Sequence, residues 1–211
     1  KIHGPLGFTD LDHEGMLVEG FDQIGTLSTI YNYPYYREHM ERLGYVKDQD
    51  WVEFLITIPK ETPERFERAV EIVKKRSGLV VKHLHSKSDV YPYAREIFRL
   101  INRAYKDLYG FVELTEKQID FYVDMYIPML RLEFLTLVIR QEDNKLVGMA
   151  IGLPSLAKAL QKAKGRFIPS GWYHIYKALK GKENNVLDLM LVAVDAEYQG
   201  KGINALIFNE F

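Results

Sequence analysis

The fold is decided by the stretch Leu189-Met-Leu-Val-Ala-Val-Asp-Ala-Glu-Tyr-Gln-Gly-Lys-Gly-Ile-Asn-Ala-Leu-Ile-Phe208, where an apolar run, two glycines and a second apolar run follow one another directly. The run ending at Val194 predicts a buried strand, and the periodic apolar run from Ala205 predicts a helix. Gly200 and Gly202 suit a tight turn between them. Backbone N–H groups at a helix start point toward one spot, where the helix dipole adds positive potential. We therefore expect this loop to bind a phosphate or pyrophosphate.

The composition is that of a folded protein with little net charge. The chain has 211 residues, of which 47% are hydrophobic, and its formal net charge is −1. This balance gives no global electrostatic attraction to nucleic acid or to a membrane, so we predict neither as a partner. The sequence contains no cysteine, which excludes disulfides and thiolate chemistry and favours a cytoplasmic location.

Both ends of the sequence suggest an internal fragment. The chain opens with Lys1 rather than Met, and it stops at Phe211, shortly after the start of the helix that should follow the glycine loop. We expect further sequence on both sides.

Residues 1–77 form the first predicted piece. Short strands are expected at Met16–Glu19 and at Trp51–Ile58, the second of which is rich in aromatic and β-branched residues. A helix over Tyr36–Leu43 is stopped by Gly44, and another begins with Thr62 as its cap and ends near Ser77.

Residues 78–211 form the second predicted piece. A strand at Leu79–Leu84 precedes two helices, the first over residues 92–108 and the second from Thr115, where Gln118 completes a capping box. Phe134–Arg140 and Leu146–Gly152 predict an antiparallel hairpin, and a basic helical insert at 155–183 precedes the strand before the glycine loop. This order predicts an α/β (α+β) fold with a mixed, mostly antiparallel sheet flanked by helices.

The glycine loop resembles the acetyl-CoA signature of the GNAT N-acetyltransferases, Gln/Arg-x-x-Gly-x-Gly/Ala after a strand. Gln199 and Gly202 match it, and Asn204 stands where Gly or Ala is usual. The resemblance covers residues 79–211 and implies a GNAT-like fold that takes acetyl-CoA, or another acyl-CoA, as co-substrate. It also implies that the pantetheine arm contacts backbone groups of Leu191, Val192, Ala193 and Val194. The pyrophosphate would then be lined by Gln199, Gly200, Lys201, Gly202, Ile203 and Asn204.

The first piece resembles the second half of a GNAT lobe. Asn32-Tyr-Pro-Tyr-Tyr-Arg-Glu-His-Met-Glu-Arg-Leu-Gly-Tyr45 is similar to the late helix of that lobe, in which a Tyr four residues before Gly acts as general acid. Met40 stands at that position, and a thioether cannot donate a proton. The resemblance therefore implies the end of a non-catalytic lobe followed by the start of a second lobe, as in a two-lobed, uncharacterised GNAT-like subgroup.

The resemblance implies an acyl-CoA-dependent N-acyltransferase acting on a small-molecule or peptide amine. Asp188 lies on the strand where some members carry a general base, and the simpler alternative is a strand-end acid exposed to water beside Asn185. The general acid would lie beyond Phe211. A non-enzymatic acyl-CoA sensor or scaffold, or a Fem-like aminoacyl transferase, are the alternatives, and the sequence leaves the oligomeric state open.

Two further groups of residues were considered as sites. The basic insert is expected to be two short helices around Gly165–Gly171, acting either as a solvated cover or as an anion-attracting lid over the acceptor pocket. His83 and His85 share a strand face, and His3, Asp10, Asp12 and His13 form a loose cluster, but neither set offers a complete metal site, so no metal is predicted.

Overall fold

A β-hairpin stands at the centre of the sheet. The computed structural model describes residues 2–9, 11–180 and 184–211. Strands β2 (Leu135–Arg140) and β3 (Leu146–Pro154) pair antiparallel, with Leu137 opposite Met149 and Val138 opposite Gly148. Both strands are almost wholly buried, because helices cover the two faces of the sheet. The predicted hairpin is confirmed.

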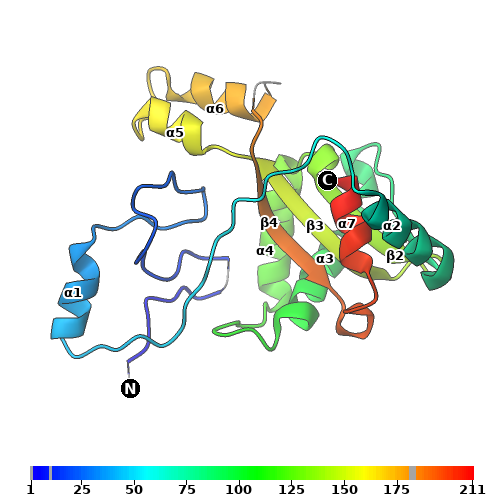
Figure 1. Ribbon diagram of the computed structural model, residues 1–211, viewed down its shortest axis with the longest axis horizontal. Coiled ribbons are helices and arrows are strands. Elements are labelled where there is room, and N and C mark those ends of the chain that lie inside the picture. The colour runs from blue at the N-terminus through cyan, green and yellow to red at the C-terminus, as the bar shows by residue number, and fades with distance from the viewer. Residues whose placement is uncertain (1, 10, 181–183) are drawn as a thin grey trace. The chain divides into compact units, whose positions relative to one another are not determined.

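The hairpin belongs to a four-stranded sheet with the order β1-β2-β3-β4 (Figure 1). Strand β1 (Leu79–Val81) is shorter than the predicted strand and pairs antiparallel with β2. Strand β4 (Leu187–Val194) runs antiparallel to β3, since Asp195 N donates to Val147 O at one end and Ser155 N donates to Val186 O at the other, both at 2.9 Å. The predicted α+β class with an antiparallel sheet is confirmed.

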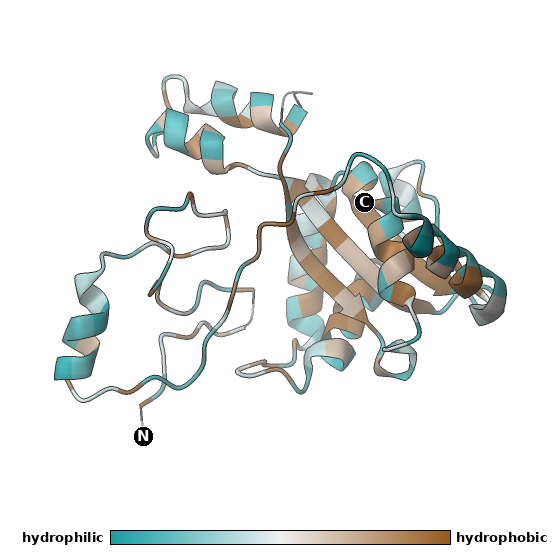
Figure 2. Ribbon diagram, viewed as in Figure 1, coloured by the Kyte–Doolittle hydropathy of each residue, from teal (hydrophilic) through white to brown (hydrophobic). Residues whose placement is uncertain are grey.

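Helices pack on both faces of this sheet (Figure 1). On one face, α2 (Glu64–Ser77) and α7 (Ile203–Glu210) contact each other, and Ile203 and Ile207 lie against Gly148 of β3. The other face carries α3 (Tyr91–Tyr105) and α4 (Glu116–Tyr126), the second opened by the predicted capping box of Thr115 and Gln118. Hydrophobic residues are concentrated in the strands of the sheet (Figure 2). One core cluster is built from Val70, Leu79, Val138, Val147, Ala150, Val194, Ile203, Leu206 and Ile207.

The chain divides into two compact units. One comprises residues 1–55 and 153–188, and the other comprises residues 56–152 and 189–211. The first unit contains α1 (Tyr35–Arg42), which ends at Gly44 with φ 86°, and the helix pair α5 (Ala157–Ala163) and α6 (Gly171–Lys180). The pair confirms the two short helices expected in the insert. Two residues of that insert, Lys182 and Glu183, lie outside the described residues. The predicted lobe boundary at Ser77 stays a prediction.

Two predicted strands of the first piece do not form. Met16–Glu19 has no regular structure, and Trp51–Ile58 is extended without pairing to another described strand. Phe54 is 78% exposed and Leu55 is 89% exposed. A strand exists only where a neighbouring backbone accepts its hydrogen bonds, and composition alone cannot supply that neighbour.

Short 3-10 turns connect several of the helices and strands. Among the described residues, no helix is both long and apolar enough to span a bilayer. The turns are η1 (Lys87–Asp89), η2 (Ile127–Met129), η3 (Leu132–Phe134) and η4 (Ala196–Tyr198).

Candidate functional site

The loop between β4 and α7 takes a path that requires glycine. Gly200 has φ 72° and Gly202, the N-cap of α7, has φ 83°, both in the left-handed region. A Cβ atom on Gly202 would lie 2.6 Å from Val73 Cγ2 of α2, whereas one on Gly200 would meet no atom within 4 Å. Conformation therefore selects glycine at both positions, and close packing selects it again at Gly202.

Several backbone N–H groups of this loop have no partner within the described part of the chain. Lys201 N donates to Tyr198 O at 3.3 Å, but the N–H groups of Gly200, Gly202, Ile203 and Asn204 meet no protein acceptor there. Three of the four belong to the N-terminal end of α7, where the helix dipole is positive. The arrangement is suited to an anion with several oxygen atoms.

Two side chains of the loop contact the protein itself. The Gln199 amide Nε2 donates to Val194 O at 3.1 Å, and Lys201 Nζ lies 5.2 Å from the centre of the Tyr198 ring. Gln199 thereby closes the loop back onto the end of β4. Lys201 is exposed, so its charge lies at the loop surface, where it can attract an anion.

Strand β4 is at the edge of the sheet, with no described strand beyond it. Its Val192 carbonyl accepts a hydrogen bond from Tyr105 Oη of α3 at 2.9 Å. In a strand, the N–H and C=O of one residue point to the same side and those of the next residue to the other. The N–H groups of Val192 and Val194 therefore lie on the outer edge of the strand, on the same side as the carbonyls of these two residues. The N–H groups of Leu191 and Ala193 face β3.

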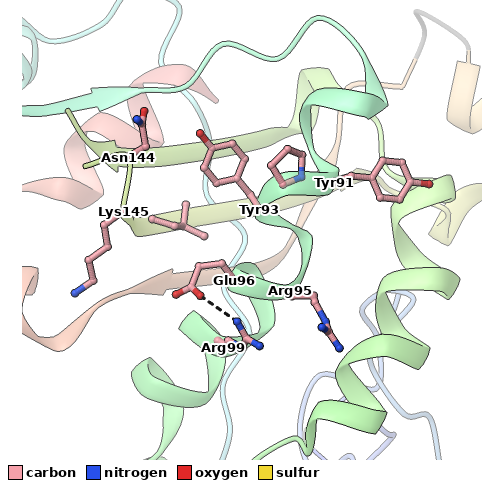
Figure 3. A pocket seen from close by; sticks show the side chains of 9 residues that line it. Tyr91, Tyr93, Arg95, Glu96, Arg99, Asn144 and Lys145 are labelled. Atoms are coloured by element: carbon pink, nitrogen blue, oxygen red, sulfur yellow. Dashed lines mark ion pairs between the residues drawn. The ribbon is translucent and has the colours of Figure 1, made fainter. Parts of the chain in front are cut away.

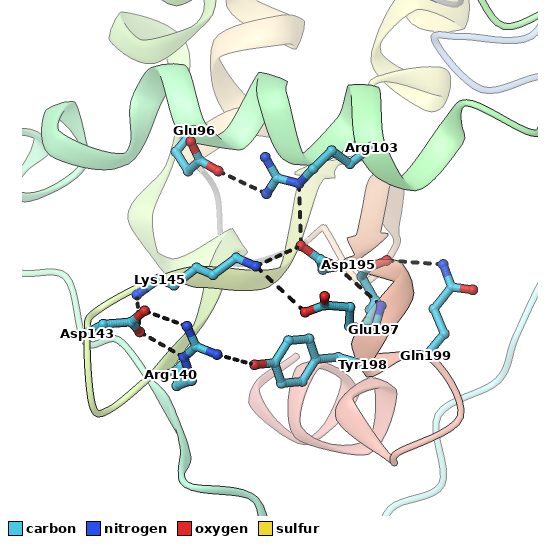
Figure 4. A network of polar contacts seen from close by, with 10 residues as sticks. Glu96, Arg103, Arg140, Asp143, Lys145, Asp195, Glu197, Tyr198 and Gln199 are labelled. Carbon is cyan, nitrogen blue, oxygen red and sulfur yellow. Dashed lines mark hydrogen bonds and ion pairs between the residues drawn. The ribbon is translucent and has the colours of Figure 1, made fainter.

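A buried carboxylate anchors the start of the loop (Figure 4). Asp195, directly after β4, is 6% exposed, and its Oδ2 lies 3.3 Å from Arg103 Nε and 3.6 Å from Lys145 Nζ. Its Oδ1 accepts from Glu197 N at 3.3 Å and caps η4. Arg103 is also paired with Glu96 at 2.9 Å. Sequence reasoning missed this network, although an acid directly after a buried strand was a visible signal.

A second ion pair fixes Tyr198, the residue before Gln199 (Figure 4). Arg140 NH1 contacts Tyr198 Oη at 3.0 Å, while its other nitrogens bind both oxygens of Asp143 in the hairpin turn. The hydrogen bonds from Arg140 hold the pKa of Asp143 well below its usual range. The loop is thus tied to α3 and to the hairpin turn through charged groups.

Asp188, the predicted general base, is a buried acid of β4. It is 9% exposed, and its Oδ2 has no hydrogen-bond partner among the described residues. Burial raises the pKa of Asp188, a hydrogen bond from Ser155 opposes that rise, and the nearby Glu53 charge adds to it. The exposed strand-end acid considered from the sequence is therefore wrong, since water does not reach this carboxyl group freely.

A separate cavity of about 490 Å³ lies between the start of α3 and the hairpin turn (Figure 3). Its cations are already paired, Arg95 with Asp120, and Arg99 with Glu116 through two contacts of 2.9 Å. None of the predicted cofactor-binding residues lines it. We therefore place the candidate anion site at the glycine loop and not in this cavity.

The histidine groups considered as metal ligands do not converge in the described ranges. No set of three or more His, Asp or Glu side chains there is placed to hold a metal ion. His3 pairs with Asp48 at 2.6 Å, and Asp10 lies outside the described residues.

Comparisons with known proteins identify distant relatives. Protein YghO of Escherichia coli (strain K12) is 26% identical over 208 residues, which cover 98% of this chain and 52% of that protein. Bacterial ceramide synthase of Caulobacter vibrioides is 27% identical over 205 residues, which cover 93% of this chain and 50% of that protein. The chain thus spans about half the length of these curated relatives. No family model and no solved structure matches it.

Proposed function

We propose that this chain carries the acyl-CoA-binding part of a GNAT-like N-acyltransferase, which moves an acyl group from a CoA thioester to an amine. The observation that carries the proposal is the loop after β4, where the N–H groups of Gly200, Gly202, Ile203 and Asn204 meet no described protein acceptor. A pyrophosphate offers the charge and the oxygen atoms that such a loop binds.

The relative named bacterial ceramide synthase supports an amide-forming reaction. A ceramide is the amide of a fatty acid and the amino group of a sphingoid base. An enzyme that makes it must form the same type of bond as an N-acetyltransferase. The match covers 93% of this chain. Among amines, a long-chain amino alcohol is therefore the acceptor that we would test first.

The edge of β4 has a role in this proposal. The outward N–H groups of Val192 and Val194 would bind the pantetheine arm as an added strand does, and a backbone N–H would polarise the thioester carbonyl. Tyr105 holds the Val192 carbonyl at 2.9 Å, and Gln199 holds the Val194 carbonyl at 3.1 Å. These two contacts keep the strand edge in place before any ligand arrives.

The chemistry requires removal of one proton and stabilisation of one leaving group. The amine nitrogen attacks the thioester carbon and loses a proton, and the C–S bond breaks. The departing thiolate takes up a proton and becomes a thiol. Asp188 is our candidate for accepting the amine proton, since it lies on the strand that leads to the loop and burial raises its pKa. Met40 cannot protonate the thiolate, so the acid is assigned to no residue of this chain.

A charge placed at the loop tests the binding proposal. Asn204 is exposed in the first turn of α7, and Asn204→Asp adds a negative charge there, which favours the helix but repels a pyrophosphate. We expect calorimetry of the full chain with acetyl-CoA and palmitoyl-CoA to show at least about a tenfold rise in Kd for the variant, which corresponds to about 1.4 kcal/mol.

Asn209→Asp is the matched control, since it makes the same change at an exposed position near the other end of α7. It should leave the Kd unchanged. No heat with either CoA ester, or equal effects of the two variants, would remove the loop from the proposal. If CoA binds but no thiol is released with sphinganine or short amines, the transferase activity is wrong for this chain and the sensor alternative holds.

A further inference from the structure

The helix pair of the first unit has a charge of one sign. Residues 155–180 contain six basic residues and no acidic one, although the whole chain has a net charge of only −1. All six side chains are exposed. They belong to α5, to the connecting loop and to α6, as Lys158, Lys162, Lys164, Arg166, Lys177 and Lys180. A balanced composition therefore conceals a local cluster of cations.

Apolar side chains are exposed beside these cations. In the loop between the helices, Phe167 is 63% exposed and Ile168 is 77% exposed. The outer face of α6 adds Trp172, Tyr173 and Tyr176, each of them more than half exposed. The buried residues of the two helices are small, namely Ala157, Ala159 and Ala163 of α5 and Gly171 of α6, and none of them is aromatic.

Local contacts order the loop that carries the apolar side chains. Trp172 N donates to Phe167 O, and Trp172 Nε1 donates to Pro169 O, both at 2.9 Å. A Cβ atom on Gly171 would lie 1.8 Å from Arg166 O, so only glycine permits this close turn. The exposed groups are therefore held in place before they meet a partner, which lowers the entropy cost of binding.

We propose that the α5–α6 pair docks on the surface of an anionic lipid bilayer. Lys and Arg side chains would contact lipid phosphates, while Trp and Tyr rings lie at the headgroup level and Phe167 and Ile168 enter the acyl boundary. This proposal departs from the expectation, drawn from net charge, that the chain has no membrane partner. This inference does not depend on acyl transfer, but a lipid-surface site would suit a long-chain acceptor.

The pattern favours a bilayer over a nucleic acid. Aromatic rings can stack on bases, but Ile168, the most exposed of the apolar side chains here, gains nothing from a base and gains free energy in an acyl layer.

Vesicle sedimentation of the full chain tests the proposal. We expect binding to vesicles of equimolar phosphatidylcholine and phosphatidylglycerol, weak binding to phosphatidylcholine alone, and loss of binding as salt rises. The triple variant Lys162→Gln/Lys164→Gln/Arg166→Gln should weaken partition at least about tenfold, because each basic residue near an anionic surface contributes to the attraction. A second variant, Phe167→Ala/Ile168→Ala, keeps the charge and should also weaken it.

A matched control removes the same charge elsewhere. Lys60→Gln/Lys74→Gln/Lys117→Gln changes three exposed lysines of the other unit and should bind vesicles as the unchanged chain does. Equal losses in the two triple variants would mean non-specific attraction and overturn the proposal. The proposal would also be overturned if neither variant of the α5–α6 pair weakened vesicle binding, or if the chain bound single-stranded RNA through these residues but did not bind vesicles. Circular dichroism checks that each variant folds.

Discussion

At the scale of single residues, two glycines of one loop are required for different reasons. Gly200 and Gly202 both have positive φ, but only Gly202 is pressed against another element. The packing of α7 on α2 therefore requires glycine at the N-cap of α7. Any ligand that uses the first N–H groups of α7 depends on this contact.

We expect Gly202→Ala to destabilise the chain more than Gly200→Ala does. Alanine in the left-handed region costs about 1–2 kcal/mol at either position. At Gly202 the added methyl group also forces Val73 to move, which costs about 1–3 kcal/mol more. Urea unfolding of both variants measures the difference. Equal losses would show that α2 and α7 can separate at this point without cost.

Asp188 should make stability depend on pH. Since burial raises its pKa in the folded chain, ionisation opposes folding, and this penalty builds up as the pH rises from the unfolded-state pKa, about 3.9, to the raised pKa of the folded chain. We expect Asp188→Asn to raise Tm by about 2–4 °C at neutral pH. The gain should fade as the pH falls below about 3.9, where the group becomes protonated in the unfolded chain as well. Scanning calorimetry across this range measures it, and a uniform loss of Tm at every pH would contradict it.

At the scale of elements, charged contacts tie the end of β4 to its neighbours. Asp195 joins the strand end to Arg103 of α3 and to Lys145 just before β3 (Figure 4). Such a carboxylate specifies where the strand stops and the loop begins. Its removal takes one carboxylate away from both cations, which then keep only Glu96 and Glu197 as partners among the described residues.

We expect Asp195→Asn to lower the free energy of unfolding by about 1–2 kcal/mol, less than for a fully buried pair because Arg103 and Lys145 reach solvent. The same substitution at Asp143, whose side chain is 44% exposed, should leave the unfolding midpoint nearly unchanged. Chemical denaturation of both variants makes the comparison. An equal effect would mean that burial of Asp195 contributes nothing.

Elements that depend on nearby residues could be predicted from the sequence. The Thr115–Gln118 capping box, the stop at Gly44 and the β2–β3 hairpin each depend on a few neighbouring residues. Trp51–Ile58 shows the limit, since strand propensity does not supply a partner strand. At the candidate site, the glycine positions were visible in the sequence. The contacts of Tyr105 and Arg103 with β4 were not, because they join residues far apart along the chain.

At the scale of the whole molecule, the two units differ in how much apolar surface they bury. The unit with the sheet has a core of buried apolar side chains, whereas most apolar side chains of residues 45–58 are exposed. No helix or strand is present between Arg42 and Glu64. This segment connects the units and has few contacts to protect it.

We expect limited chymotrypsin digestion to cut first within residues 51–58. Phe54 and Leu55 are among the most exposed apolar side chains there, and proteases cleave where the backbone is extended and accessible. The unit with the sheet should persist, since Leu137 and Met149 at its centre have no exposed surface. Phe54→Ser/Leu55→Ser should slow the first cut without changing later ones. Should residues 51–58 resist cleavage while β2 or β3 is cut, the segment must be covered in solution, and its apolar face would then belong to an interface.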